Sequence, residues 1–413
     1  MRGSLLFLLA CLWLAGCAAP AARSAADAAP LILVSLDGLR AEYLERGLTP
    51  TLGRFARDGV RAEAMRPSYP SLTFPNHYSI VTGLRPDHHG IVDNAMRDPE
   101  LGTFAMHDRD AVSDGRWWGG EPIWVTAERA GLRVAAMFWP GTEADILGVR
   151  PHWWQAFSYD VPAEARVERV LTWLRLPMAE RPRLITLYFE HVDRAGHDHG
   201  PDSPQLTQAL QLVDRQIATL LAGVERIGVE ANVIIVSDHG MAPVSASRLE
   251  FVEDLVALED IELWDTGTSL LIAPKPGREA AVEARLLGRH GHVECWRKGE
   301  LPARWHYGTH ARIAPIVCQL DVGWFGVTRE QLQRHGGLTR GGSHGYDPDD
   351  PSMAAIFMAR GPAFRRGVLL PAFDNVHVYP LLAHLLGVTP APNDGDARVL
   401  QPALAEARAV PEH

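Results

Sequence analysis

Residues 232–240 read NVIIVSDHG, a short run of β-branched residues that ends in an acid, a histidine and a glycine. Residues 31–38 read LILVSLDG and end in a similar way. Near-continuous apolar runs of this kind are typical of strands that are covered on both faces of a parallel sheet. Because ligands collect at the carboxyl ends of such strands, we expect Asp37, Asp238 and His239 at a binding edge.

Other short apolar runs alternate with longer amphipathic stretches along the chain. We expect strands at Leu31–Leu36, Leu132–Phe138, Arg183–Phe189, Asn232–Ser237, Ser269–Ala273 and Ala354–Ala359. We expect helices at Pro50–Asp58, Pro162–Leu176, Pro204–Ile227 and Val376–Leu386. Strands that alternate with helices predict an α/β protein with a doubly wound, mostly parallel sheet sandwiched by helices.

The composition bounds the function. Apolar residues make up 46% of the 413 positions and charged residues 22%, as in ordinary globular proteins. Acidic residues outnumber basic ones by 50 to 40, for a net charge of −10. No basic surplus exists to neutralise a phosphate backbone, which argues against binding of a nucleic-acid duplex. Small phosphate esters stay open as substrates, because a metal can supply the positive charge.

The amino-terminal segment is expected to lie outside the fold. Residues 1–16 combine one arginine with an apolar run that is too short to span a bilayer, the pattern of a signal peptide. The sequence LAGC at 14–17 resembles the lipobox of bacterial lipoproteins, which implies lipid attachment at Cys17; the alternative is a plain signal peptide. Residues 17–30 are expected to be a flexible tether. Together they predict a periplasmic protein of the bacterial cell envelope, anchored to the outer membrane.

Two cysteines remain in the part of the chain that we expect to fold. In an oxidising periplasm Cys295 and Cys318 form either a disulfide or two buried thiols, and the sequence leaves both alternatives open.

Three more metal-ligand residues follow the same logic. Asp193 and His197 come after a third apolar run, and their i,i+4 spacing places them on one face of a helical turn. His344 lies in GGSHGYD, where the glycines permit close backbone approach. With the first three residues this makes three aspartates and three histidines, a donor set that suits Zn²⁺ more than Mn²⁺. Six ligands divide into two sets of three, each with an open position, as in catalytic zinc sites.

Thr73 is the candidate nucleophile. It lies in PSLTFPNHYSIVTG, residues 70–83, at the start of an expected helix. A threonine at that point is normally an N-cap. The alternative is a hydroxyl nucleophile, which needs an activator because its own pKa is far above neutrality. A metal could supply the activation, and a helix N-terminus favours a bound phosphoryl group.

Several segments resemble the nucleotide pyrophosphatase/phosphodiesterase family of the alkaline phosphatase superfamily. They are LVSLDGLR, PSLTFPNHYSIVTGLRPDHHGIVDN, MFWPG, LYFEHVDRAGHDHGP, IIVSDHGM and GGSHGYD, in order from about residue 31 to residue 396. The resemblance implies an alkaline phosphatase-like catalytic domain at 31–400, with a small insertion covering the site at roughly 245–335 and a tail at 401–413.

The resemblance also implies roles for single residues. Asp193, His197 and His344 would hold one of two zinc ions per subunit, and the other would be held by Asp37, Asp238, His239 and the oxygen of Thr73. Asn94 would donate a hydrogen bond to a phosphoryl oxygen. Phe74 and Tyr188 match residues that line a nucleoside pocket, and Tyr159 would stack on the base. The segment EHVDRAGH departs from the commoner form, which has Pro before the aspartate and Ser after it.

These expectations define a function. The chain would hydrolyse phosphodiester or pyrophosphate bonds of nucleotides, with zinc and a covalent threonine intermediate, and release nucleoside 5′-monophosphates. The alternatives are a phosphomonoesterase, a phosphonate hydrolase or a lipid head-group phosphodiesterase of the same superfamily. A lipid-anchored binding protein without catalysis is the non-enzymatic alternative. The expected partner is a small-molecule phosphodiester, and no obligate protein partner is expected.

Overall fold

The computed structural model describes residues 29–334, 336–337 and 341–405. The predicted signal peptide, the lipid anchor at Cys17 and almost all of the predicted tether lie outside these residues, as does most of the predicted tail. Among the described residues, no helix combines the length and the apolarity needed to cross a membrane.

A seven-stranded sheet forms the centre of the molecule, in the order β19-β2-β18-β8-β1-β7-β6. The strands are β1 Leu31–Leu36, β2 Val60–Ala62, β6 Val134–Met137, β7 Leu184–Phe189, β8 Asn232–Val236, β18 Phe357–Arg360 and β19 Val368–Leu370. Strand β1 pairs in parallel with β7 and β8, and β6 is parallel to β7, whereas β18 is antiparallel to β8 and β2. The predicted doubly wound, mostly parallel sheet is confirmed.

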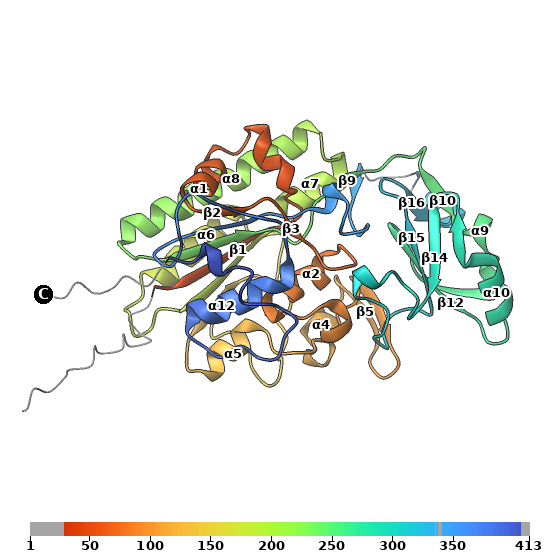
Figure 1. The fold of residues 1–413 in the computed structure, drawn as a ribbon, viewed down its shortest axis with the longest axis horizontal. Coiled ribbons are helices and arrows are strands. Elements are labelled where there is room, and N and C mark those ends of the chain that lie inside the picture. Colours follow the sequence, from red (N-terminus) through yellow and green to blue (C-terminus); the bar gives the residue numbers. More distant parts are fainter. Residues whose placement is uncertain (1–28, 335, 338–340, 406–413) are drawn as a thin grey trace, which may run out of the picture.

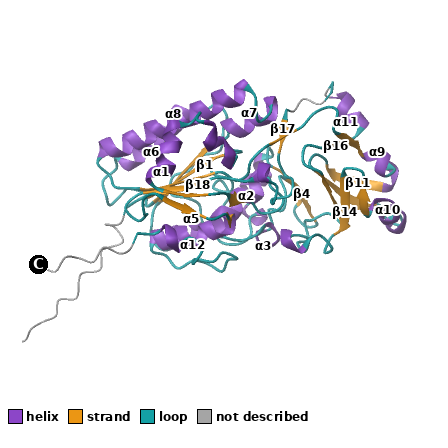
Figure 2. Ribbon diagram, turned by 45° about the horizontal axis from the view of Figure 1, so that its top comes forward, coloured by secondary structure: helices purple, strands orange, loops and turns teal. Residues whose placement is uncertain are grey.

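Helices cover both faces of the sheet (Figures 1 and 2). One face carries α1 Pro50–Asp58, α6 Ala163–Leu174 and α8 Pro204–Ile227, and the other carries α2 Thr73–Thr82, α5 Ile123–Arg129 and α12 Val378–Leu386. Side chains of β1 alternate between the two hydrophobic cores: Ile32 and Val34 pack toward α8, and Leu31 and Leu33 toward α2. This explains the continuous apolar run, because both faces are buried.

Short elements connect these layers. They are β3 Met65–Arg66, β4 Ala95–Asp98, β5 Gly102–Ala105, β9 Ala242–Pro243, β17 Gly342–Ser343, β20 Phe373–Asp374, α3 Pro86–His89, α4 Arg109–Ser113 and α7 His191–His199. Strands β9 and β17 pair with each other although about 100 residues separate them, and this pairing closes the base of a large excursion of the chain.

That excursion forms a second, smaller body, at the right in Figure 1. Its five-stranded sheet has the order β11-β12-β15-β14-β13. The strands are β11 Ile261–Asp265, β12 Ser269–Pro274, β13 Gly288–His290, β14 Val293–Arg297 and β15 Ile316–Leu320; β10 Leu249–Phe251, β16 Phe325–Val327, α9 Val252–Leu255, α10 Glu279–Leu286 and α11 Arg329–Arg334 accompany them. The predicted strand Ser269–Ala273 is therefore real and lies within the predicted insertion, but it pairs in an antiparallel sheet and not in the parallel sheet expected for these apolar runs.

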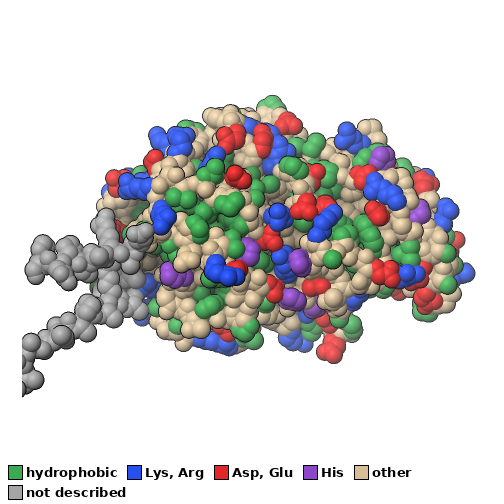
Figure 3. All heavy atoms as spheres, in the orientation of Figure 1, with side chains coloured by type: hydrophobic (Ala, Val, Ile, Leu, Met, Phe, Trp, Pro, Cys, Tyr) green, Lys and Arg blue, Asp and Glu red, His purple; other side chains and the backbone are tan. Residues whose placement is uncertain are grey.

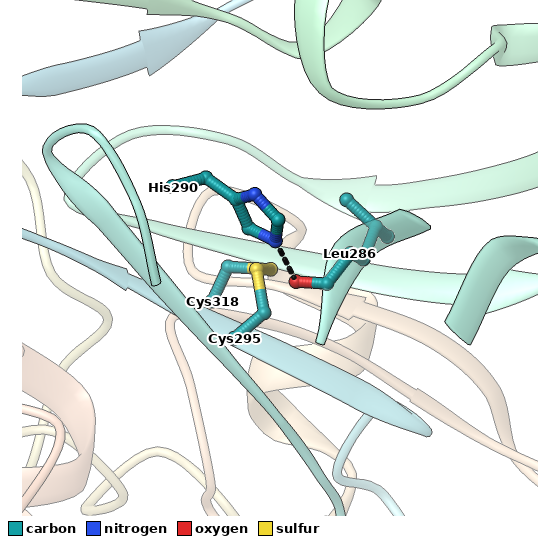
Figure 4. The surroundings of a disulfide bond; sticks show 4 residues. All are labelled: Leu286, His290, Cys295 and Cys318. Carbon is teal, nitrogen blue, oxygen red and sulfur yellow. Dashed lines mark hydrogen bonds between the residues drawn. A yellow bond between two sulfur atoms is a disulfide. The ribbon is translucent and has the colours of Figure 1, made fainter. Parts of the chain in front are cut away.

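A disulfide joins Cys295 and Cys318 inside this smaller body (Figure 4). The two residues face each other directly in the antiparallel pair β14–β15, and both are buried. Next to the bond, the His290 ring donates a hydrogen bond to the carbonyl oxygen of Leu286 at 2.9 Å. The structure thus selects the disulfide from the two alternatives that the sequence left open.

Replacing both bridge cysteines, Cys295→Ala with Cys318→Ala, should lower the free energy of unfolding by about 3 kcal/mol. This is the loop-closure value for a bridge that encloses a loop of this size. Denaturant unfolding of the oxidised wild type, the reduced wild type and the double variant would measure it. Two free thiols in the non-reduced wild type, titrated after unfolding without reductant, would contradict the bridge.

Candidate active site

The carboxyl ends of β1, β7 and β8 meet at one edge of the central sheet. Asp37 follows β1, and its carbonyl oxygen accepts a hydrogen bond from the backbone N–H of Asp193, in α7, at 3.0 Å. The N–H of Gly38 donates to Asp238 Oδ1 at 3.1 Å. Gly38 has a φ of +68°, and a Cβ there would lie 2.8 Å from the Asp193 Cα. Only glycine permits this close approach of the two chain segments.

His344 reaches the same edge from the far end of the excursion. It directly follows β17, whose partner β9 begins three residues after His239. A Cβ at Gly342 would lie 2.5 Å from the carbonyl oxygen of Gly196 in α7. The glycines before His344 therefore allow β17 to lie against α7, as expected from the sequence.

All six predicted metal ligands come together here. Three groups of ligand-type atoms each lie within 4.8 Å of one another. They are Asp193 with His197 and His344, Asp37 with Asp193 and His239, and Asp37 with His77 and Asp238. The clusters could hold metal ions, and they contain one histidine that the sequence analysis did not select.

Backbone carbonyl groups orient the three predicted histidine ligands. In each of His197, His239 and His344, ring atom Nδ1 contacts a carbonyl oxygen. The acceptors are those of Gly342, Gly240 and Ser71, at 3.0, 2.9 and 2.8 Å, respectively. A proton on Nδ1 leaves Nε2 as the acceptor, and the Nε2 atoms of His197 and His344 face each other at 2.9 Å. Such carbonyl contacts fix the tautomer of metal-binding histidines.

His77 differs from these three because its Nε2 atom contacts a hydroxyl group, that of Ser35, which belongs to none of the three groups of ligand-type atoms. Nε2 lies 2.8 Å from Ser35 Oγ, and Nδ1 lies 2.9 Å from the Thr73 carbonyl oxygen and 3.2 Å from Asp238 Oδ2. We therefore assign His77 to positioning Thr73 and Asp238, not to metal binding. Its spacing of four residues from Thr73 in α2 was the available signal, since i and i+4 share a helix face.

In the described part of the chain, histidines and not lysines or arginines pair with the carboxylates of this cluster. Within the described residues, Asp37 Oδ1 and Asp193 Oδ1 are buried and have no hydrogen-bond partner. Burial, with repulsion from Asp238 and Asp193, raises the pKa of Asp37 well above its ordinary value. Burial acts in the same direction on Asp238, but His239 and His77 hold its pKa well below the usual range. Oxygen and imidazole donors with unpartnered buried oxygens fit a divalent metal.

Thr73 is the first residue of α2, not its N-cap. The cap position belongs to Leu72, and no side chain caps this end by a hydrogen bond. The Thr73 hydroxyl instead lies 3.3 Å from His239 Nε2, and the residue is 5% exposed. The capping alternative is therefore wrong, and the hydroxyl points toward the metal-ligand cluster.

Asn94 lies beside the start of the same helix. Its Oδ1 accepts a hydrogen bond from the backbone N–H of Phe74 at 2.9 Å. This contact leaves the amide N–H groups of Asn94 to donate elsewhere. The Phe74 ring is buried against Phe104 and Trp118, with centroids 5.9 and 5.8 Å away.

The two tyrosines differ in their surroundings. Tyr188 is buried, and its hydroxyl donates to Asp37 Oδ2 at 2.6 Å, a role that the sequence did not predict. Tyr159 is 59% exposed, and the guanidinium carbon of Arg194 lies 5.4 Å from the centre of its ring. Phe157, which the sequence analysis missed, contacts both tyrosine rings at 5.7 and 4.8 Å.

A family model described as type I phosphodiesterase/nucleotide pyrophosphatase matches residues 31–347. The chain belongs to this family. The match includes both strand ends, the Thr73 helix, α7 and His344, so the resemblance stated from the sequence is confirmed.

Known relatives agree with this assignment. A venom phosphodiesterase of Naja atra is 38% identical over 89% of this chain, and an uncharacterized pyrophosphatase/phosphodiesterase of Schizosaccharomyces pombe is 39% identical over 88%. The alignments span 45% and 78% of those proteins, so this chain covers less than half of the venom enzyme. Murine ectonucleotide pyrophosphatase/phosphodiesterase 5 shares the fold, with a TM-score of 0.86, 33% identity and coverage of 91% and 100% of the two chains.

Variants of two histidines should separate the ligand role from the positioning role. His344→Ala should lower the bound divalent metal per chain, because it removes an Nε2 donor from the cluster. His77→Gln should retain the metal, because both of its nitrogens already contact protein groups. Elemental analysis of each purified variant after dialysis would measure the content.

A matched control is Asp202→Asn, which changes an exposed acid that pairs with Arg46 and belongs to none of the three groups of ligand-type atoms. Chelation should also destabilise the wild type, by about 4 kcal/mol if the free metal had stood at a thousand times its dissociation constant. An unchanged thermal midpoint after complete chelation would rule out metal ions as the occupants of the cluster.

Proposed function

We propose that this chain hydrolyses phosphodiester and pyrophosphate bonds of nucleotides and releases nucleoside 5′-monophosphates. The observation that carries the proposal is the Thr73 hydroxyl, which lies 3.3 Å from His239 Nε2 at the edge of the metal-ligand cluster. The names of the relatives support the reaction class. A structure of the inactive Thr-to-Ala variant of the murine relative in complex with AMP supports a nucleoside monophosphate as the product.

Two divalent cations complete the proposed site, and the donor set favours zinc. Asp193, His197 and His344 would hold one cation; Asp37, Asp238, His239 and the Thr73 oxygen would hold the other. When bound, the cations would lower the pKa of the Thr73 hydroxyl and offset charge on the phosphoryl and leaving oxygens.

The reaction then follows from groups of this chain. Thr73 Oγ1 attacks phosphorus, a Thr–O–P bond forms, and the bond from phosphorus to the leaving oxygen breaks. The electron pair of that bond departs with the leaving group, which takes up a proton. Water then attacks the phosphorus of the threonyl phosphodiester, and Thr73 leaves with the electron pair of the Thr–O–P bond. The hydroxyl regains its proton, and a nucleoside 5′-monophosphate is released.

Asn94 supplies the hydrogen-bond donor for the phosphoryl group. With its Oδ1 held by the Phe74 N–H, its amide donates to a non-bridging oxygen, where charge develops in the transition state. A neutral amide suits a diester, which carries one negative charge fewer than a monoester. The side chain that meets the phosphoryl group thus favours diesters over monoesters.

Thr73→Ala should lower the turnover of p-nitrophenyl thymidine monophosphate by at least about 10,000-fold, because it removes the nucleophile. Thr82→Ala is the matched control, since that hydroxyl bonds to the Tyr78 carbonyl at the other end of α2. Metal content measured on both variants would separate lost chemistry from lost metal. Near wild-type turnover by Thr73→Ala would refute the assignment of the nucleophile.

Asn94→Ala should lower kcat for the same diester by about 100- to 1,000-fold, the usual effect of removing one transition-state donor. The measurement should include phenyl phosphate, phosphonoacetate and a choline phosphodiester beside the nucleotide. If the wild type preferred one of these three, the substrate class proposed here would be wrong, although the metal site could stand.

A further inference from the structure

A pocket lies at the amino ends of the central strands, the opposite edge of the sheet from the metal-ligand cluster. Its volume is about 630 Å³, and its lining includes Pro30, Arg181, Arg183 and Asn232. Pro30 directly precedes β1, Arg183 directly precedes β7, and Asn232 begins β8. The pocket is therefore formed where three neighbouring strands enter the sheet, at the left in Figure 1.

Arg183 carries a buried charge in this pocket. The residue is only 8% exposed, and its Nε and Nη1 atoms are buried with no hydrogen-bond partner in the described part of the chain. Arg181 Nε is also buried without a partner, although its Nη2 donates to the Leu176 carbonyl at 3.1 Å. Burial lowers the pKa of the Arg183 guanidinium below its usual value. An unpaired buried cation of this kind costs several kcal/mol.

Arg312 provides an internal comparison, because it is also 8% exposed. Its Nε donates to Asp98 Oδ2 at 2.7 Å, and its Nη1 donates to the carbonyl oxygens of Gly90 and Trp117 at 2.8 and 2.6 Å. The same degree of burial is thus accompanied by full pairing in one arginine, whereas Arg183 has no carboxylate within 4.0 Å among the described residues.

The lining of the pocket indicates the kind of ligand that would pair with these arginines. Glu230 and His384 line it but are exposed, whereas Pro182 is buried and Met178 adds a half-exposed apolar side chain. Two guanidinium groups with free donors therefore meet an apolar wall. The planar fork of arginine matches the oxygens of a phosphate group in a bidentate geometry.

We propose that this pocket binds a phosphate group through Arg183 and Arg181. The face shown in Figure 3 mixes acidic and basic side chains, and the whole chain has a net charge of −10, so phosphate binding would not come from a generally basic protein. Pro30 lies 13 residues after Cys17, and a fully extended chain of 13 residues would span about 43 Å. The phosphate could therefore belong to a lipid headgroup or be a free ion, and the experiment must distinguish these sources.

Thermal unfolding and calorimetry with inorganic phosphate would test the site in the purified protein. We expect Arg183→Gln to weaken phosphate binding at least about tenfold, the effect of losing one charge-assisted hydrogen bond. The variant should also be at least as stable as the wild type without phosphate, because it removes the unpaired charge. Arg175→Gln is the matched control, since that exposed arginine pairs with Glu168 on α6. Nucleotide hydrolysis by Arg183→Gln should stay at the wild-type rate.

A second arm uses vesicles of phosphatidylcholine with and without phosphatidylglycerol, and the Cys17→Ser protein, which cannot be lipidated. Vesicle binding that needs phosphatidylglycerol and is lost in Arg183→Gln would identify a lipid headgroup as the ligand. If Arg183→Gln loses binding of inorganic phosphate while its vesicle binding equals that of the wild type, the ligand is the free ion. If Arg183→Gln failed to fold, Arg181→Gln would take its place. Equal binding of both probes by wild type and variant would overturn the proposal.

Discussion

Mutual repulsion among Asp37, Asp193 and Asp238 is the constraint on which the rest of the site depends. The three acids converge at one edge of the sheet, where the backbones that carry Asp37 and Asp193 are joined by a hydrogen bond of 3.0 Å. Among the described residues, no lysine or arginine forms an ion pair with them. Imidazole rings and the Tyr188 hydroxyl are their polar side-chain neighbours. A divalent cation would stabilise such a cluster, because buried acids without a cationic partner otherwise favour the protonated form, as the raised pKa of Asp37 shows.

The fold meets this constraint with separate segments that rigid backbone contacts hold together. Two aspartates follow neighbouring strands of one sheet, whereas Asp193 and His197 share a face of α7. His344 belongs to neither arrangement, since it follows the whole smaller body in the sequence. The pairing of β9 with β17 makes the excursion leave and return at one point, which keeps His344 beside His239. The smaller body also contacts this segment, because the Thr268 hydroxyl donates to the carbonyl oxygen of His344 at 3.0 Å.

The sequence predicted the parts of this structure that repeat a local pattern. Strand β1 and helices α1 and α8 have the predicted bounds, because their apolar spacing and terminal residues are unambiguous. The run Ser269–Ala273 was expected to be typical of a parallel sheet but is antiparallel to both of its neighbours, since an apolar run carries no information about its partner strands. The six candidate ligands were selected because each follows a strand or a glycine, whereas the hydrogen bonds of His77 to Ser35 and of Tyr188 to Asp37 were not predicted. These contacts depend on tertiary geometry, and the four-residue spacing of His77 from Thr73 is the one local signal among them.

Two buried arginines, Arg166 and Arg183, differ in their pairing at opposite ends of the central strands. Arg166 is fully buried near the carboxyl end of β7. Its guanidinium donates to both oxygens of Glu190, at 2.5 and 3.0 Å, and to the Tyr188 carbonyl at 3.0 Å. Arg166 and Arg312 are therefore both buried and both paired with groups of the chain itself. Arg183, at the amino ends of the strands, differs because its Nε and Nη1 atoms have no partner among the described residues. At the carboxyl ends of the strands, Asp37 Oδ1 and Asp193 Oδ1 are in the same position. Buried carboxylate oxygens without a partner at one edge, and buried guanidinium nitrogens without a partner at the other, thus support the cation proposed at the first and the phosphate proposed at the second.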